Sequence, residues 1–128
     1  MIYLDSSVVL AYLFAETRRP AGGFWADRFL SSRLLQYEVW NRLHARGLAI
    51  TVSDLTQAVF DRVSLVDLTA DVLDRALDPF PVGVRTLDAL HLATLVHLRE
   101  SGIPVTLASY DARLVSAARA LDFEIAPL

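Results

Sequence analysis

Short apolar runs along this chain alternate with longer segments in which apolar residues recur every three or four positions. The continuous apolar runs predict buried strands at residues 2–4, 63–68, 105–108 and 123–125. The segments between them predict helices at residues 8–15, 24–30, 34–46, 70–77, 86–100 and 111–121, and one more from Thr51 or Ser53 to about residue 62. Buried strands that alternate with helices are typical of a parallel sheet covered on both faces. The pattern therefore predicts a three-layer α/β/α domain with a central, mostly parallel sheet.

Polar residues and glycines mark the ends of several predicted helices. The segment Asp5-Ser6-Ser7 and the pair Ser31-Ser32 precede helices, where side-chain oxygens can accept hydrogen bonds from free backbone N–H groups. Thr69 stands at the equivalent position before the helix at residues 70–77. Gly47 and Gly102 follow two other helices, which is where glycine commonly ends a helix.

The length and composition fit one folded domain. A chain of 128 residues suits a single domain, here residues 1–128, and its 54% hydrophobic content is too high for intrinsic disorder. The absence of cysteine excludes a disulfide scaffold, a thiolate zinc site and a cysteine nucleophile. The longest unbroken apolar run, residues 8–15, is much shorter than the roughly 20 residues that cross a bilayer. We therefore expect a cytoplasmic protein with no membrane partner.

The charged residues exclude further classes of protein. All twelve cationic residues are arginine, and with fifteen acidic residues the net charge is −3. Without lysine the chain cannot form a Walker A phosphate loop or a Schiff base with a cofactor. Phosphoacceptor receiver domains and haloacid-dehalogenase-type phosphotransferases also begin with a strand and an acidic residue, but they rely on a lysine near the aspartate.

Four acidic residues are predicted to lie near one edge of the sheet. Asp5 and Asp111 follow predicted strands, and ligands of open parallel sheets bind beyond the carboxyl ends of the strands. Asp88, in the first turn of one helix, and Glu38, in the first half of another, could reach that edge. Asp5 and Asp88 have apolar neighbours, and a carboxylate buried among them needs a partner. A hard divalent cation, Mg²⁺ or Mn²⁺, suits such oxygen ligands.

Each acidic residue also has an ordinary structural explanation. Asp5 and Asp111 could simply cap the helices that follow them. Asp88 could interact with the positive end of its helix dipole. Glu38 and Arg42, four residues apart on one helix, could form a surface ion pair.

Hydroxyl and imidazole groups accompany the four acids. Ser6 follows Asp5, and Ser109 precedes Asp111 by two residues; these serines could form turns and caps, or bind a metal-bound water or a phosphate oxygen. His91 lies one turn after Asp88, where it could orient that carboxylate or serve as an ordinary core histidine. His91 and His97 are six residues apart and do not share a helix face well, which argues against a zinc site.

The order and spacing of these motifs identify a family. The chain resembles the PIN-domain ribonucleases, and most closely the VapC toxins of bacterial type II toxin–antitoxin pairs. The resemblance rests on four stretches that span nearly the whole chain: residues 2–7, residues 32–42, residues 85–93 with Asp-Ala-Leu-His-Leu-Ala, and residues 109–118 with Ser-Tyr-Asp-Ala-Arg-Leu. Where the family commonly has glycine near the end of the last helix, this chain has Asp122.

The resemblance implies a PIN-like fold and a set of site residues. It implies a Mg²⁺-dependent endoribonuclease, with Mn²⁺ as a possible substitute, in which a metal-activated water attacks phosphorus and leaves 5′-phosphate and 3′-hydroxyl ends. By position, the family's catalytic and metal-binding acids correspond to Asp5, Glu38, Asp88 and Asp111, and its accessory hydroxyls to Ser6 and Ser109. Arg42 or Arg85 could add positive charge.

The resemblance also implies partners, namely an RNA substrate, a cognate antitoxin and a second copy of the chain in a homodimer. Because the net charge is negative, any RNA-binding surface must be local, and it would draw on Arg18, Arg19, Arg42, Arg46 and Arg85.

Two other functions stay open from the sequence. One is a PIN nuclease of RNA processing, which a neighbouring antitoxin gene would argue against. The other is a catalytically silent PIN fold used for binding or regulation. The four intact acids argue against a silent domain. A metal titration distinguishes a silent domain from a nuclease, because a silent domain need not bind Mg²⁺ at this site.

Overall fold

A five-stranded parallel sheet forms the middle layer of the computed structural model, which describes all 128 residues. The strands lie in the order β3-β2-β1-β4-β5, and every neighbouring pair is parallel. Their bounds are Ile2–Leu4 for β1, Phe29–Ser32 for β2, Val63–Val66 for β3, Thr106–Ala108 for β4 and Glu124–Ile125 for β5.

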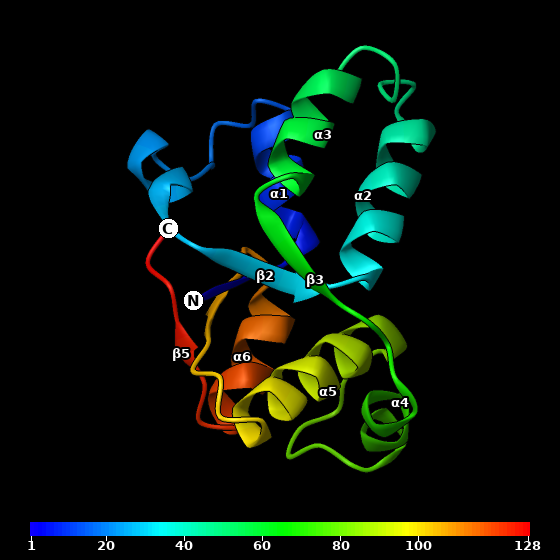
Figure 1. The fold of residues 1–128 in the computed structure, drawn as a ribbon, viewed down its shortest axis with the longest axis vertical. Coiled ribbons are helices and arrows are strands. Elements are labelled where there is room, and N and C mark those ends of the chain that lie inside the picture. The colour runs from blue at the N-terminus through cyan, green and yellow to red at the C-terminus, as the bar shows by residue number, and fades with distance from the viewer.

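Six α-helices cover the two faces of this sheet (Figure 1). One face carries α1 (Ser6–Leu13), α2 (Leu34–Ala45) and α3 (Ser53–Phe60). The other carries α4 (Ala70–Leu77), α5 (Thr86–Glu100) and α6 (Ala112–Ala120). The predicted three-layer α/β/α architecture is confirmed. No helix is both long and apolar enough to span a membrane.

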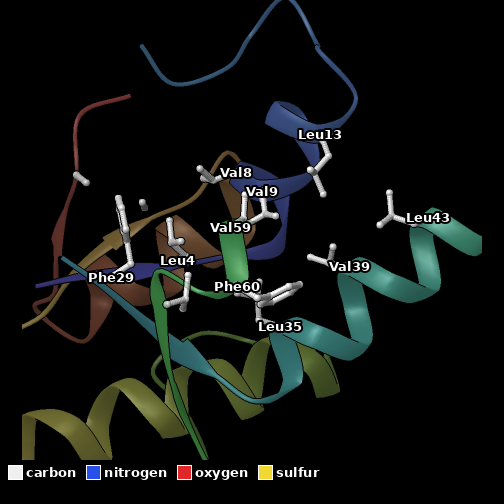
Figure 2. Packing of buried hydrophobic residues seen from close by; sticks show 13 residues of the cluster. Leu4, Val8, Val9, Leu13, Phe29, Leu35, Val39, Leu43, Val59 and Phe60 are labelled. Atoms are coloured by element: carbon white, nitrogen blue, oxygen red, sulfur yellow. The ribbon is translucent and has the colours of Figure 1, made fainter. Parts of the chain in front are cut away.

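Two hydrophobic cores lie on opposite sides of the sheet because successive strand residues point to opposite faces. In β1, Leu4 belongs to the core under α1, α2 and α3, whereas Tyr3 belongs to the core under α5 and α6. Figure 2 shows Leu35, Val39 and Leu43 of α2 along the side of that helix that faces α1. Their spacing of four residues places them on one helix face, which explains why this segment forms a helix against the sheet.

One predicted element is wrong. Residues 24–30 do not form a helix: a short 3₁₀ helix covers Gly22–Ala26, and strand β2 follows at Phe29–Ser32. All four residues of β2 are buried, and the Ser31 hydroxyl donates to the Leu4 carbonyl at 2.6 Å. Because two of its four residues are serines, β2 lacks the continuous apolar run that predicts a buried strand. Its pairing with β1 and β3 stabilises the strand.

The predicted helix ends agree with the structure in several places. Helix α5 has the predicted bounds, and the Thr69 hydroxyl accepts from the Val72 N–H at 3.4 Å as the cap of α4. Ser32 accepts from the Leu34 N–H at 3.1 Å. Gly47 and Asp122 have φ angles of 67° and 65°, in the left-handed region that aspartate tolerates better than most residues.

Candidate functional site

The point where the strand order reverses lies between β1 and β4. The chain leaves β1 toward β2 and later returns to the other side of β1 as β4. Open parallel sheets form ligand crevices at such a point, beyond the carboxyl ends of the strands. A cleft of about 1110 Å³ lies here, and its lining includes all four predicted acids: Asp5, Glu38, Asp88 and Asp111.

Asp5 is the most deeply buried of the four acids, with 5% of its surface exposed. It follows β1 and caps α1, and its backbone N–H donates to the Ala108 carbonyl of β4 at 3.0 Å. Its Oδ2 accepts hydrogen bonds from Ser7 Oγ at 2.6 Å, Ser109 Oγ at 2.8 Å and the Ser7 N–H at 3.4 Å. Every protein donor therefore reaches one oxygen, and Oδ1 is left for a ligand in the cleft.

Ser7 is a site residue that the sequence reasoning missed. Its hydroxyl donates to Asp5 and accepts from the Tyr110 N–H at 2.9 Å, which ties α1 to the loop after β4. Ser6 lines the cleft but makes no side-chain hydrogen bond within the protein. The signal was available, because a hydroxyl two residues after an aspartate is a common local hydrogen-bond partner.

Asp111 combines two of the roles considered for it. Its Oδ1 accepts from the Arg113 N–H at 2.9 Å and the Leu114 N–H at 3.4 Å as the N-cap of α6, while its carboxylate also lines the cleft. Its own N–H donates to Ser109 Oγ at 2.9 Å. Ser109 thus links Asp111 to Asp5 by accepting from one and donating to the other.

Asp88 lies in the first turn of α5 and shows that the acids crowd one another. Its burial, followed by the negative charges of Asp111 and Asp5, raises the pKa of the Asp88 carboxyl above its ordinary value. Nearby carboxylates destabilise one another's ionised forms. Glu38 adds to the same shift, so each of the other three acids lies within electrostatic reach of Asp88.

A buried histidine forms a hydrogen bond with Glu38. His91 Nε2 lies 2.6 Å from Glu38 Oε1, and His91 Nδ1 lies 2.7 Å from the Tyr3 hydroxyl. Of the roles considered for His91, orientation of Asp88 is not observed: no hydrogen bond joins them, and the buried imidazole binds Glu38 of α2 instead. Burial disfavours the imidazolium, but the hydrogen bond and charge of Glu38, together with the charges of Asp5 and Asp88, raise the pKa of His91 overall.

Four arginines share the cleft with the acids: Arg18, Arg42, Arg85 and Arg113. None of them is ion-paired, since the ion pairs of the structure join Arg33 to Asp67 and His91 to Glu38. The surface pair considered for Glu38 and Arg42 therefore does not form. The Arg18 guanidinium lies 4.6 Å from the centre of the Tyr110 ring, a cation–π contact that holds it at the cleft.

The predicted basic surface is only partly located at the cleft. Arg18, Arg42 and Arg85 line it, but Arg19 and Arg46 do not. The Arg46 guanidinium instead stacks over the Phe14 ring, 4.4 Å from its centre. Arg113, which the sequence reasoning left out, lines the cleft because it lies in the first turn of α6, next to Asp111.

The donor set fits a hard divalent cation by chemistry and by place. Four carboxylates line one cleft, and Asp5 Oδ1 has no hydrogen-bond donor from the protein, but no three acidic or histidine side chains converge on a single ion. Mg²⁺ does not require such convergence, because it usually keeps several waters and binds one or two carboxylates together with substrate phosphates. Asp5, Glu38, Asp88 and Asp111 are the residues that could hold it.

Comparison with known proteins shows the family. The family model for the PIN domain matches residues 2–120. This chain belongs to the PIN-domain family. Ribonuclease VapC35 of Mycobacterium tuberculosis (strain CDC 1551 / Oshkosh) is 31% identical over 134 residues, which cover 98% of this chain and 95% of the relative. Ribonuclease VapC46 of Mycobacterium tuberculosis (strain ATCC 25618 / H37Rv) is 31% identical over 132 residues, with 97% and 95% coverage.

Within the PIN-domain family the chain is of the VapC type. The crystal structure of Mycobacterium tuberculosis VapC20, described as a sarcin–ricin-loop-cleaving toxin, superposes with a TM-score of 0.67. The match covers 91% of this chain and 95% of VapC20 at 22% identity. At that identity the likeness shows the fold, whereas the membership rests on the family model and the two relatives.

Proposed function

We propose that this PIN domain is a Mg²⁺-dependent endoribonuclease that acts as the toxin of a toxin–antitoxin pair, with Mn²⁺ as a substitute. One observation carries the proposal: four carboxylates and four unpaired arginines line a single cleft at the reversal point of a parallel sheet. Carboxylates suit a hard cation, and arginines suit phosphates. A phosphodiester substrate needs both.

The four acids would hold the cation. When bound, Mg²⁺ lowers the pKa of a coordinated water and stabilises the charge that develops on the phosphate. Asp5 is the anchor of this set, because hydrogen bonds from Ser7 and Ser109 fix its carboxylate while Oδ1 stays free. Glu38 is fixed by its hydrogen bond with His91.

The arginines would bind the RNA backbone on either side of the cleaved bond. Arg85 precedes α5, Arg42 lies on α2 and Arg113 on α6, so they approach the cleft from three different elements. A guanidinium donates two parallel hydrogen bonds to a phosphate. If water attacks phosphorus and the bond to the 3′-oxygen breaks, the products carry 5′-phosphate and 3′-hydroxyl ends, as the resemblance to PIN-domain ribonucleases implies.

The VapC relatives support a toxin role over a role in RNA processing. VapC20 is described as a toxin, and the chain covers 95% of the length of VapC35. We therefore propose a cognate antitoxin and a homodimer as its partners. The antitoxin would inhibit the ribonuclease. Expression of this protein without its antitoxin should therefore slow bacterial growth.

The substitution Asp5→Asn tests the proposed activity. We expect purified protein to cleave total RNA with Mg²⁺ or Mn²⁺ and to stop when excess chelator is added. Asp5→Asn should lower the rate of cleavage by at least about 100-fold. The substitution removes the negative charge of the carboxylate that we propose as the anchor of the cation, so Mg²⁺ should bind more weakly. Arg119→Ala, on the exposed face of α6 and outside the cleft, is the matched control and should cleave normally.

Three readouts complete the test. End-mapping of the products should find 5′-phosphates, and expression in bacteria should arrest growth for the wild-type protein but not for Asp5→Asn. Absence of cleavage, together with no change in melting temperature on adding Mg²⁺ or Mn²⁺, would contradict the proposal. That result would favour a catalytically silent PIN domain that serves as a binding module.

A further inference from the structure

Three polar side chains form a continuous line from the buried core to the cleft. The Tyr3 hydroxyl lies 2.7 Å from His91 Nδ1, and His91 Nε2 lies 2.6 Å from Glu38 Oε1. Tyr3 comes from β1, His91 from α5 and Glu38 from α2, so the line joins both faces of the sheet. Exposure rises along it, from 0% for Tyr3 and 1% for His91 to 16% for the Glu38 side chain.

The direction of each hydrogen bond follows from the donors available. The Ser32 N–H donates to the Tyr3 hydroxyl oxygen at 3.2 Å, and the Tyr3 proton is available to donate to His91 Nδ1 when the imidazole is neutral. In the neutral imidazole that accepts at Nδ1, the hydrogen is on Nε2, which donates to Glu38 Oε1. The Ser32 N–H and the Tyr3 hydroxyl thereby favour a His91 that donates from Nε2 to Glu38.

The two sides of Glu38 consequently differ. Oε1 is bound to His91, while Glu38 also lines the cleft and Oε2 has no donor from the protein. A glutamate on a helix surface samples many rotamers, and binding of a ligand to it costs the conformational entropy of those rotamers. Anchored at Oε1, the carboxylate already presents one oxygen to the cleft.

Two acids of the cleft lie close in the chain to Tyr3 and His91. Tyr3 lies two residues before Asp5 in the chain, and His91 lies three residues after Asp88 on α5. Asp5 therefore follows directly on the strand that carries Tyr3, and Asp88 lies on the helix that carries His91. A shift of β1 or α5 would move an acid and its buried support together.

We propose that Tyr3 and His91 are positioning residues that hold Glu38 ready to bind a divalent cation in the cleft. The proposal rests on the proposed function, because it concerns the same cation. Side chains that hydrogen-bond to metal ligands typically change metal affinity by 10- to 100-fold when they are removed. A core that only needed filling could use phenylalanine and leucine at these positions, without buried polar groups that require partners.

Binding of Mn²⁺ to the protein without RNA tests this proposal. Titration followed by the electron paramagnetic resonance of free Mn²⁺ yields a dissociation constant for each variant. We expect His91→Leu to weaken binding by about 10- to 100-fold. Tyr3→Phe should weaken it less, because Nε2 keeps access to Glu38 but the tautomer is no longer fixed. His91→Gln retains a side-chain N–H donor and should recover part of the affinity.

Thr56→Val is the matched control. Thr56 is fully buried in α3, its hydroxyl donates to the Val52 carbonyl at 2.8 Å, and it lies outside the cleft. Thr56→Val should lose stability as the His91 and Tyr3 variants do, yet bind Mn²⁺ like the wild-type protein. If His91→Leu is too unstable to purify, Tyr3→Phe carries the comparison, because it removes one oxygen and keeps the ring.

A spectroscopic readout separates positioning from packing. In protein labelled with ¹⁵N-histidine, the wild-type His91 signals should show hydrogen on Nε2, and Mg²⁺ should shift them because it draws charge from Glu38. In Tyr3→Phe the Nδ1 signal should move before any cation is added.

Two outcomes would overturn the proposal, and they differ. Wild-type affinity in both His91→Leu and Tyr3→Phe, with melting temperatures lowered as in Thr56→Val, would show that the line only stabilises the core. A wild-type protein that binds no Mn²⁺ would contradict the proposed function itself, and the positioning role with it.

Discussion

At the scale of single residues, the acids of the cleft differ in how much the fold compensates their charge. Asp5 receives hydrogen bonds from two serines, Asp111 from the N-terminus of α6, and Glu38 from His91. Asp88 has no hydrogen-bond donor from a side chain and feels the charges of Asp111 and Asp5. Its ionised form is therefore the least favoured by the protein alone.

Asp88→Asn should stabilise the cation-free protein while it impairs Mg²⁺ binding. Because the pKa of Asp88 is raised in the folded state, folding favours the protonated form, and stability falls as pH rises through the unfolded pKa toward the folded one. At pH 7 in chelator, removal of the charge should raise the free energy of unfolding by about 0.2–0.5 kcal/mol, a small value because solvent screens the group. Thermal unfolding measures this difference.

The control for Asp88→Asn is Asp71→Asn. Asp71 occupies the first turn of α4 as Asp88 does that of α5, but it lies outside the cleft. Its loss should leave stability unchanged or lower it slightly, since only a favourable interaction with the helix dipole is removed. The gain from Asp88→Asn should vanish below about pH 4, where the carboxyl is protonated in the unfolded chain. A gain that persists at that pH would rule out charge crowding as its cause.

At the scale of elements, α6 and β2 differ in how far their own residues specify them. The local sequence specifies α6 but not β2. Helix α6 begins at a residue that the chain itself marks, because Asp111 caps it through the N–H groups of Arg113 and Leu114. Strand β2 carries no comparable mark, and two of its four residues are buried serines. The local pattern therefore predicts α6 correctly, whereas β2 depends on the parallel strands beside it.

The cap and ligand roles of Asp111 can be separated by two substitutions. Asp111→Asn keeps a good N-cap, so the free energy of unfolding should change by less than about 0.5 kcal/mol while Mn²⁺ binding weakens. Asp111→Ala removes both roles and should cost about 0.5–2 kcal/mol as well. Urea unfolding and Mn²⁺ titration of the same samples measure the two effects. Equal loss of stability in both variants would mean that the charge, and not the cap, stabilises α6.

At the scale of the whole molecule, positive charge gathers at the cleft although the net charge of the chain is negative. The chain has a net charge of −3, yet four of its twelve arginines gather at one cleft. Affinity for RNA should therefore depend on this local cluster and fall steeply with salt.

The salt dependence of RNA binding tests that distribution. With Asp5→Asn, which should bind without cleaving, the slope of log affinity against log salt should be about −3, since each of four phosphate contacts contributes about 0.7 for a single strand. Replacement of Arg42 or Arg85 by alanine should reduce the slope by about 0.7, and Arg119→Ala should leave it unchanged. Fluorescence anisotropy of a labelled RNA pool measures it. Slopes that do not differ among these variants would place the RNA elsewhere on the surface.

The sequence by itself determined the features that neighbouring residues control. Apolar runs, helix caps such as Thr69, left-handed positions such as Gly47, and the order of the four acids can all be interpreted without a structure. The parallel sheet follows from them, because continuous apolar strands must be covered on both faces. The family motifs then specify which acids share a site.

Only the tertiary structure decided the contacts between distant parts of the chain. His91 binds Glu38, 53 residues away, in place of Asp88 on its own helix, and Ser7 rather than Ser6 reaches Asp5 and the loop after β4. Arg113 joins the cleft because α6 begins at its edge. Sequence spacing fixes which helix face a side chain occupies, but its hydrogen-bond partner depends on which element packs against that face. That packing is a property of the whole sheet with its helices, and no local pattern contains it.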